Sequence, residues 1–286
     1  MLKFLGNTLL TTTIAFVLVW SGCSTESVPL SSGGEQQALS LAKQAGVPAV
    51  DVIPVYRVAT GKNGERLTVF VFYEKGGKGG GKPPKDGGGE SCSDPNANQE
   101  HALLGVKWPQ ANIPVAYQPT FEPDAVVGAA FTAIDLGFGA WKQAVENPIV
   151  TFSFSEDALA PLPPERDDSN VVGWRQLVGR DARKVLAATY IWDDGGTILE
   201  ADIVYNTAHK WAVNGAIIEP TDCGKDFDVQ AIGTHEIGHF IGLGHVNTDD
   251  ATMFGSAAKG ELKKQTLTRG DADGAKQVLL APPPPS

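Results

Sequence analysis

Histidine, cysteine and methionine are scarce in this chain, and basic residues are outnumbered by acidic ones. Its 286 residues include five histidines, three cysteines and two methionines, and 23 basic against 33 acidic residues give a formal net charge of -10. This excess of negative charge argues against nucleic acid as a partner. The length and a hydrophobic fraction of 42% predict one medium-sized globular domain with extensions, expected as a monomer.

The first residues predict export. Lys3 precedes a largely apolar run through Trp20 that ends at Ser21-Gly22-Cys23, the pattern of a secretion signal. Ser-Gly-Cys resembles a bacterial lipobox, in which signal cleavage leaves a lipidated cysteine, here Cys23, as a membrane anchor in the cell envelope. Trp20 stands where leucine is usual. The alternatives are ordinary signal cleavage with secretion, or an uncleaved anchor.

Three of the five histidines follow the spacing H-E-x-x-H-x-x-G-x-x-H, from His235 to His245. On an α-helix, His235 and His239 lie one turn apart and can aim at a common point. An unbroken helix would carry His245 roughly 15 Å from His235, too far to share an ion bound at about 2 Å. The chain must therefore leave the helix near Gly242, because glycine adopts a left-handed conformation at low cost.

This spacing indicates a catalytic zinc site. Three neutral imidazoles leave the fourth position of Zn²⁺ for water, and Glu236 stands where it can accept the proton of that water as general base and deliver it to the leaving amine. The alternative is a buried helix, since the residues between the histidines are largely apolar. A core has no need of three histidines and a glutamate at these intervals.

The extended motif resembles that of the metzincin clan of zinc endopeptidases and, within it, that of the matrixins. Metzincins place a methionine-containing turn under the zinc, and Met253, in Ala251-Thr252-Met253-Phe254, follows the third histidine by eight residues. An ordinary core methionine is the alternative. No tyrosine follows Met253 closely, which argues against the astacin-like and serralysin-like branches.

The resemblance covers about residues 104–280 and implies the α+β metzincin (zincin) fold. That fold has a twisted, mixed, mainly parallel sheet with an antiparallel edge strand, a zinc-binding helix, a Met-turn and a C-terminal helix. A helix with Asp124 as its cap is predicted over residues 124–146 from apolar residues spaced three and four apart. Strands are predicted at 149–154, 170–174, 185–192 and 198–206. Residues 267–274 resemble the start of the family's last helix, with Gly270 in place of its first aspartate and Asp271 as the second.

Residues 185–192 resemble the edge strand along which matrixins bind substrates. The backbone of Leu186, Ala187, Ala188 and Thr189 is then expected to pair with an extended protein or peptide substrate. An interior strand fits this mostly apolar run equally well.

Two further metal sites are weighed in the sequence. Asp193 and Asp194 are candidates for binding Ca²⁺, although surface turns favour aspartate and glycine in any case. Vertebrate matrixins carry a second, structural zinc, but only His101 and His209 remain here for it, which argues against such a site.

Composition divides the chain into five segments: a signal peptide with a lipobox (1–23), a small N-terminal region or propeptide (24–75), a flexible Gly/Lys/Pro-rich linker (76–103), the catalytic domain (104–281) and a Pro-rich tail (282–286). The N-terminal region is expected to contain a short helix near 36–45 and a hairpin about Asn63-Gly64. So small a unit is expected to pack on the catalytic domain or to serve as a propeptide.

The remaining cysteines allow two interpretations. With Cys23 lipidated, Cys92 and Cys223 are left, and in an oxidising envelope such a pair predicts a disulfide. The resemblance implies the alternative of a cysteine switch, in which Cys92 occupies the open zinc position until a propeptide is cleaved. Pro95 fits the family's switch, whereas the residues that replace its arginine and aspartate do not.

The sequence therefore predicts an exported, lipid-anchored zinc metalloendopeptidase. The alternative from another class is a noncatalytic zinc-binding or peptide-binding envelope lipoprotein on the same fold. Glu236 discriminates between them, because binding zinc alone does not require a general base.

Overall fold

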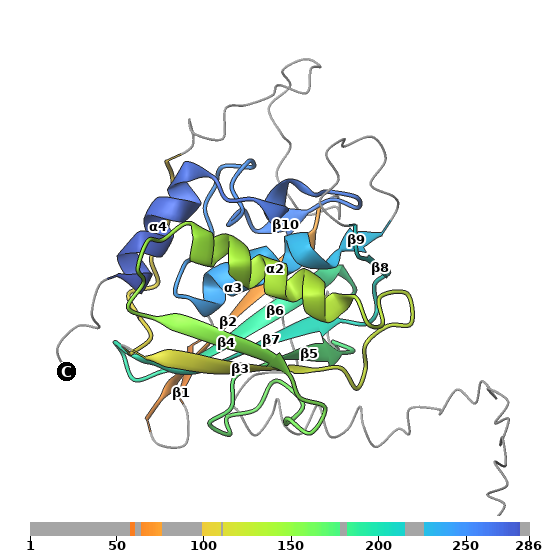
Figure 1. The fold of residues 1–286 in the computed structure, drawn as a ribbon, viewed down its shortest axis with the longest axis horizontal. Helices are drawn as coiled ribbons and strands as arrows, with labels where there is room; N and C mark the ends of the chain where they lie inside the picture. The colour runs from red at the N-terminus through yellow and green to blue at the C-terminus, as the bar shows by residue number, and fades with distance from the viewer. Residues whose placement is uncertain are drawn as a thin grey trace, which may run out of the picture.

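The computed structural model describes residues 58–60, 64–75, 99–109, 111–177, 182–214 and 226–280. They form a sheet of eight strands with helices packed above one face (Figure 1). The strand order is β1-β2-β6-β7-β5-β3-β4, and β10 pairs with β2.

The elements follow one another as β1 (Val58–Thr60), β2 (Arg66–Glu74), β3 (Asn112–Gln118), α2 (Ala130–Gln143), β4 (Thr151–Glu156), β5 (Val171–Arg175), β6 (Val185–Asp193), β7 (Ile198–Asn206), β8 (Trp211–Ala212), β9 (Phe227–Asp228), α3 (Val229–Phe240), β10 (Ser256–Ala257) and α4 (Arg269–Leu279). Strands β4, β3, β5 and β7 are parallel, whereas β6 runs antiparallel to β7. The predicted α+β class with a mixed, mainly parallel sheet is confirmed.

Helix α2 packs its apolar stripe against α3 (Figure 1). Ile134, Phe138 and Trp141, at spacings of four and three, are buried as the sequence pattern predicts. The predicted start of the helix was wrong. The N-cap is Ala129, which makes no side-chain cap, and Asp124 lies in the preceding turns. Gly128, at φ +75°, forces a turn immediately before the helix.

The hairpin predicted before the linker is confirmed, but its second strand belongs to the main sheet. β1 pairs antiparallel with β2, and Thr60 lies opposite Arg66 across a turn that contains Gly64 at φ +90°. β2 continues along β6, from Arg66 opposite Asp193 to Tyr73 opposite Val185. β2, which comes from the segment assigned to a small N-terminal region, therefore belongs to the sheet of the predicted catalytic domain.

This pairing corrects the prediction that residues 185–192 form an edge strand. β6 lies between β2 and β7, and all nine of its residues are buried. Ala187, Ala188 and Thr189 are paired with neighbouring strands of this same chain on both sides, and Leu186 lies at the register shift between β6 and β2. The physical reason is in the sequence, because a strand that is apolar on both faces fits an interior position.

Several predictions lie outside the described residues: the helix near 36–45, the Pro-rich tail, and Cys23, Cys92 and Cys223 with the lipid anchor, disulfide and switch that depend on them. Within the described part of the chain, no helix is long and apolar enough to cross a membrane.

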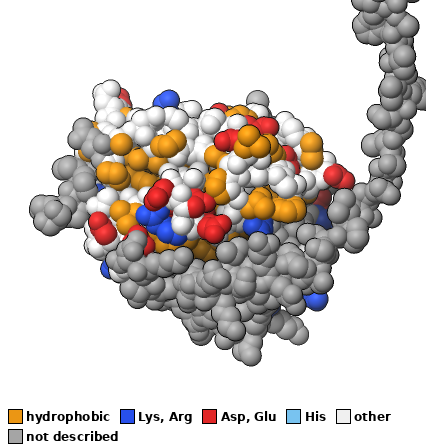
Figure 2. Space-filling view, turned by 90° about the horizontal axis from the view of Figure 1, so that it is seen from below, with side chains coloured by type: hydrophobic (Ala, Val, Ile, Leu, Met, Phe, Trp, Pro, Cys, Tyr) orange, Lys and Arg blue, Asp and Glu red, His pale blue; other side chains and the backbone are white. Residues whose placement is uncertain are grey.

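The underside of the molecule in Figure 2 mixes both signs of charge. Over the part of this face that the structure describes, acidic and basic side chains are interspersed with apolar ones. The described part of this face therefore shows no large patch of one charge.

Candidate functional site

Helix α3 carries the motif through the middle of the molecule, between α2 and the sheet (Figure 1). Its N-cap is Asp228, whose carboxylate accepts a hydrogen bond from the Ala231 amide at 2.7 Å. His235, Glu236 and His239 are each 0% exposed. Three polar side chains on a fully buried helix need a specific partner, because burying unsatisfied polar groups costs stability.

The helix ends where the sequence predicts. Gly242 adopts φ +111°, and the amide of Leu243 donates back to the carbonyl of Gly238 at 2.9 Å. A side chain at Gly242 would place its Cβ 2.8 Å from the carbonyl oxygen of Val106, so glycine is required by space as well as by conformation. This turn brings His245 back towards the helix.

The three histidines meet at their Nε2 atoms. The distances are 3.1 Å between His235 and His239, 3.0 Å between His239 and His245, and 3.2 Å between His235 and His245. Ligand nitrogens about 2 Å from a tetrahedral zinc stand roughly 3.3 Å apart, so this triangle fits that ion. Among the described residues, these three are the group of histidine, cysteine and carboxylate side chains with such convergence.

The other nitrogen of two rings is fixed by the backbone. His235 Nδ1 lies 2.6 Å from the carbonyl oxygen of Thr252, and His239 Nδ1 lies 2.7 Å from that of Leu243. A proton on Nδ1 donates to these carbonyls, which leaves the lone pair of Nε2 pointing at the common centre.

Burial keeps these imidazoles neutral. Loss of hydration lowers the pKa of His235 and His239 well below the usual range and that of His245 to about 4. Neutral imidazole is the form that binds a metal ion. The residues present therefore fit a zinc ion in both geometry and protonation.

Glu236 lies beside the triangle, held by a strand. The Thr189 hydroxyl donates to Glu236 Oε2, while the buried Oε1 has no hydrogen-bond partner in the protein. Burial raises the pKa of Glu236 to about 8, and the bond from Thr189 opposes that rise. An oriented carboxylate with one free oxygen is suited to accept and return a proton.

Met253 packs against α3 directly below the histidines. The Val246 amide donates to the carbonyl of Met253 at 3.1 Å, which closes the loop after His245. A Cβ built at Gly238 would lie 2.2 Å from the sulfur of Met253, so the methionine occupies the space that this glycine leaves open. The predicted turn beneath the histidines is thus present in the structure.

Comparison with known proteins agrees with this geometry. The sequence pattern of the matrixin family matches residues 130–279, more than half of the chain, including all three histidines, Glu236 and Met253. This chain belongs to the matrixin family.

The relatives of this matrixin include plant proteases. Metalloendoproteinase 2-MMP of Arabidopsis thaliana is 30% identical over 179 residues, which cover 62% of this chain and 44% of that protein. Metalloendoproteinase 5-MMP of the same plant is 37% identical over 51 residues, which cover 18% and 14% respectively. The chain therefore spans less than half the length of the curated relatives it matches.

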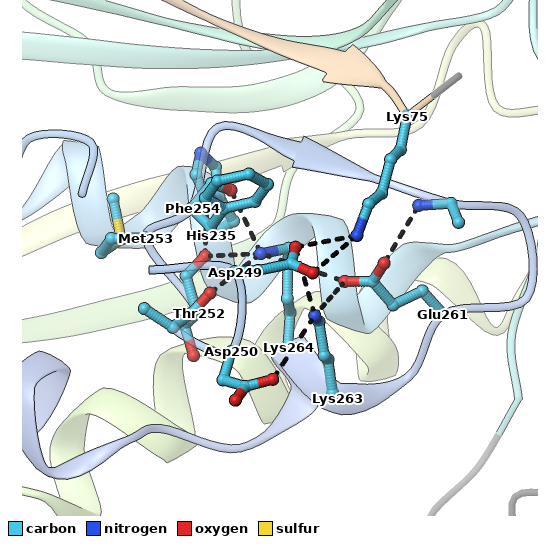
Figure 3. A network of polar contacts seen from close by, with 12 residues as sticks. Lys75, His235, Asp249, Asp250, Thr252, Met253, Phe254, Glu261, Lys263 and Lys264 are labelled. Carbon is cyan, nitrogen blue, oxygen red and sulfur yellow. Dashed lines mark hydrogen bonds and ion pairs between the residues drawn. The ribbon is translucent and has the colours of Figure 1, made fainter. Parts of the chain in front are cut away.

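The Met-turn of this matrixin is held by two residues whose contact with it was not predicted, and Figure 3 shows the first of them, Lys264. Lys264 is fully buried, and its Nζ donates to the carbonyls of Ala251 at 2.9 Å and Phe254 at 3.1 Å. Asp271 accepts the amide of Thr252 at 2.9 Å while it forms a capping box with Thr268 at the start of α4. The resemblance had singled out Asp271 near the start of the last helix, whereas the sequence gave no signal for Lys264.

The candidate calcium residues accept hydrogen bonds from their own turn and from Arg66 of β2. Asp193 accepts from Arg66 Nε at 2.8 Å and from the Gly195 amide at 2.7 Å. Asp194 accepts from the amide of Thr197 at 2.8 Å. Calcium binding stays a prediction, and each of the two carboxylates already accepts hydrogen bonds from the protein.

The two remaining histidines of this matrixin lie apart from the zinc triangle. His101 contacts the side-chain amide of Gln277, and His209 Nε2 lies 2.9 Å from the carbonyl oxygen of Val185. Neither is part of the converging group.

Proposed function

We propose that this matrixin is a zinc-dependent endopeptidase that hydrolyses protein or peptide substrates. His235, His239 and His245 hold one zinc ion, and Glu236 serves as general base. The observation that carries the proposal is the triangle of Nε2 atoms with a buried glutamate beside it. Family membership and the plant relatives named metalloendoproteinases support the same reaction class.

Each residue has a defined task in this mechanism. A zinc ion held by His235, His239 and His245 would supply Lewis-acid chemistry, lowering the pKa of water and polarising the scissile carbonyl. Glu236 takes the proton of the attacking water at Oε1 and passes it to the leaving amine. Thr189 holds Oε2, so that Oε1 stays oriented throughout the proton transfers.

The test compares the full chain with Glu236→Ala on an unstructured protein substrate, with zinc content measured for both. A general base contributes about 10²–10⁴-fold, so cleavage by the variant is expected to fall by that factor at equal zinc occupancy. Glu146→Ala, which changes an exposed glutamate, is the control and keeps full activity. A chelator abolishes cleavage in the parent, and added zinc restores it.

Retention of activity by Glu236→Ala would remove this residue from the mechanism. If zinc-loaded protein with an accessible site cleaves none of several substrates, the noncatalytic alternative replaces the peptidase. Zinc content decides between loss of the base and loss of the metal.

We also propose that the chain is exported and anchored to the cell envelope through a lipid on Cys23. The support is the sequence from Lys3 to Cys23, with its apolar run and terminal Ser-Gly-Cys. Metabolic labelling with a fatty acid tests it, with Cys23→Ser as the matched variant. Equal labelling of parent and variant would contradict the anchor, whereas export without labelling would leave secretion as the route.

A further inference from the structure

Strand β2 occupies a position that bears directly on the zinc triangle. It runs antiparallel to β6 over Arg66–Tyr73 and parallel to β10, where Tyr73 lies opposite Ser256. β10 follows the Met-turn in the chain, and the amide of Lys75 donates to the carbonyl of Ala257 at 2.7 Å. β2 is therefore hydrogen-bonded on one side to β6 and on the other to the segment that follows Met253.

Two aromatic rings of β2 lie flat on the histidines. The ring of Phe70 stacks on His239 at 4.3 Å and 17°, and that of Phe72 stacks on His235 at 3.9 Å and 23°. Alternate residues of a strand share a face, so one extended segment delivers both rings to the site. Phe70 is 5% and Phe72 0% exposed. With these rings in place, a second peptide has no access to the histidine faces that they cover.

The other face of β2 has a different environment. Leu67, Val69 and Val71 pack with Tyr190 and Trp192 on the side of the sheet that faces away from α3. The two faces therefore separate the contacts that hold the strand in the sheet from those that cover the histidines.

The end of β2 is fastened by charge as well as by backbone pairing (Figure 3). Lys75 Nζ lies 2.8 Å from both carboxylate oxygens of Asp249, in the loop between His245 and Met253. Both side chains are partly exposed, and such pairs contribute about 0–1 kcal/mol. The main attachment of β2 is therefore its strand pairing and its buried rings.

We propose that β2 lies in the peptide-binding position of this enzyme and is its tethered occupant in the intact chain. This position takes extended segments with aromatic side chains two residues apart. The proposal rests on the peptidase function above. Backbone pairing with β6 and β10 supplies affinity, and the faces of His235 and His239 select aromatic rings. The intact chain is accordingly less active than a chain from which β2 has been displaced.

A tethered strand excludes free peptides by mass action. A segment joined to its site by a flexible linker has an effective concentration of about millimolar or more. Residues 76–91 join β2 to the rest of the chain and are rich in glycine, lysine and proline. A free peptide at micromolar concentration therefore binds only when the docking of β2 is weakened.

The first arm of the experiment measures binding without turnover. The probe is a fluorescent synthetic peptide with the sequence of residues 66–75, titrated by polarisation against zinc-loaded full chain that carries Glu236→Gln. Adding Phe70→Ala and Phe72→Ala to the protein is expected to tighten binding of the probe at least tenfold. A probe that lacks both phenylalanines is expected to lose this affinity.

The matched control removes two phenylalanines at the same spacing from another strand. Phe152 and Phe154 on β4 are partly buried against the same core, away from β2. Phe152→Ala with Phe154→Ala is expected to leave probe binding at the level of the Glu236→Gln parent. Equal tightening in both double variants would mean general loosening of the fold and would overturn the proposal.

The second arm locks β2 in place, so that the proposal stays testable even where the double variant fails to fold. Val71 and Ala188 are paired across β2 and β6. Val71→Cys with Ala188→Cys, in the otherwise active chain, joins the strands through a disulfide on adjacent strands. The cross-linked chain is expected to lose any residual peptide cleavage and to regain it on reduction, whereas equal cleavage in the two states would overturn the proposal.

The two arms separate this proposal from the peptidase function. Specific probe binding without cleavage by any variant would support the peptide-binding position and contradict the enzyme. Cleavage that is unaffected by the cross-link would support the enzyme and contradict the role of β2.

Discussion

At the scale of single residues, the metal helix depends on the missing side chain of Gly238. Met253 and Trp141 fill the space next to the Cα atom of this residue. A Cβ there would lie 2.2 Å from the methionine sulfur and 2.8 Å from the tryptophan ring. The helix can therefore sit on the Met-turn only if this position carries no side chain. Gly238 thus sets how closely the histidines approach the turn beneath them.

Gly238→Ala is expected to destabilise the protein by about 1–3 kcal/mol, because a methyl group inserted into a filled core forces its neighbours to shift. Gly139→Ala on α2 is the matched control, since its Cβ meets nothing within 4 Å. There, relief of the glycine penalty in a helix is expected to stabilise by about 0.5–1 kcal/mol. Urea unfolding of the three proteins measures both changes, and equal effects at the two glycines would contradict the packing argument.

The histidine spacing predicted the convergence, because helix geometry fixes where residues four apart point, and the exit at Gly242 followed from the same argument. Thr189 was assigned a backbone role, and its hydroxyl contact with Glu236 was missed. Its one available signal was that it is a polar residue in an apolar strand. Lys264 gave no signal, because a lysine that reaches back to a turn ten residues earlier has no distinctive local pattern.

At the scale of elements, α4 and the Met-turn are joined through Asp271. Its carboxylate accepts the amides of Thr252 at 2.9 Å and Met253 at 3.3 Å and also closes the capping box of α4. One side chain therefore fixes both the start of a helix and the loop under the histidines. The turn is held from α4 as well as from Lys264.

Asp271→Ala is expected to cost about 2–4 kcal/mol of stability, because it removes a helix cap and leaves buried amides without acceptors. Zinc affinity is expected to fall as well, since His235 donates to the carbonyl of Thr252 in the same turn. Asp273→Ala, two residues later in an exposed ion pair with Lys276, is the control and changes neither quantity appreciably. A fall in stability without any change in zinc affinity would show that the turn does not depend on α4.

The predictions of elements were wrong where contacts with residues distant in sequence determine the position of an element. The strand at 198–206 was predicted with the observed bounds, because its local pattern is sufficient. The interior position of residues 185–192 in the sheet was not predicted, because their neighbour β2 lies more than 100 residues earlier in the chain. The start of α2 shifted from Asp124 to Ala130, since the turns before Gly128 resemble a helix in their apolar spacing alone.

At the scale of the whole molecule, stability is linked to buried carboxylates on the face of β7 that points away from α3. Glu200 accepts from Arg166 at 2.7 Å and from the Asp167 amide at 3.1 Å, and Asp202 accepts from the Val171 amide at 2.8 Å. Burial raises the pKa of Glu200 to about 7 and that of Asp202 well above its usual range. These two groups fasten the loop between β4 and β5 to the sheet.

The pH dependence follows from the direction of these shifts. Because the folded state holds the proton of Glu200 more tightly than the unfolded state, its contribution is complete below about pH 4.5 and is lost as pH rises to about 7. The change is on the order of 3 kcal/mol. Comparison of the parent with Glu200→Gln at equal zinc, by urea unfolding from pH 4.5 to 7.5, is expected to show a smaller loss in the variant. Parallel curves would mean that Glu200 is ionised throughout.

The order of the elements along the chain fixes the order in which they are synthesised. β2 is followed by roughly 180 residues before Met253 completes the site, and at translation rates of about 5–20 residues per second that interval lasts roughly ten to forty seconds. Arg66 and Asp193, which pair at the far end of β2 and β6, are 127 positions apart. The covering strand is therefore always made before the histidines it covers. A newly made chain that contains all three histidines therefore always contains β2 as well.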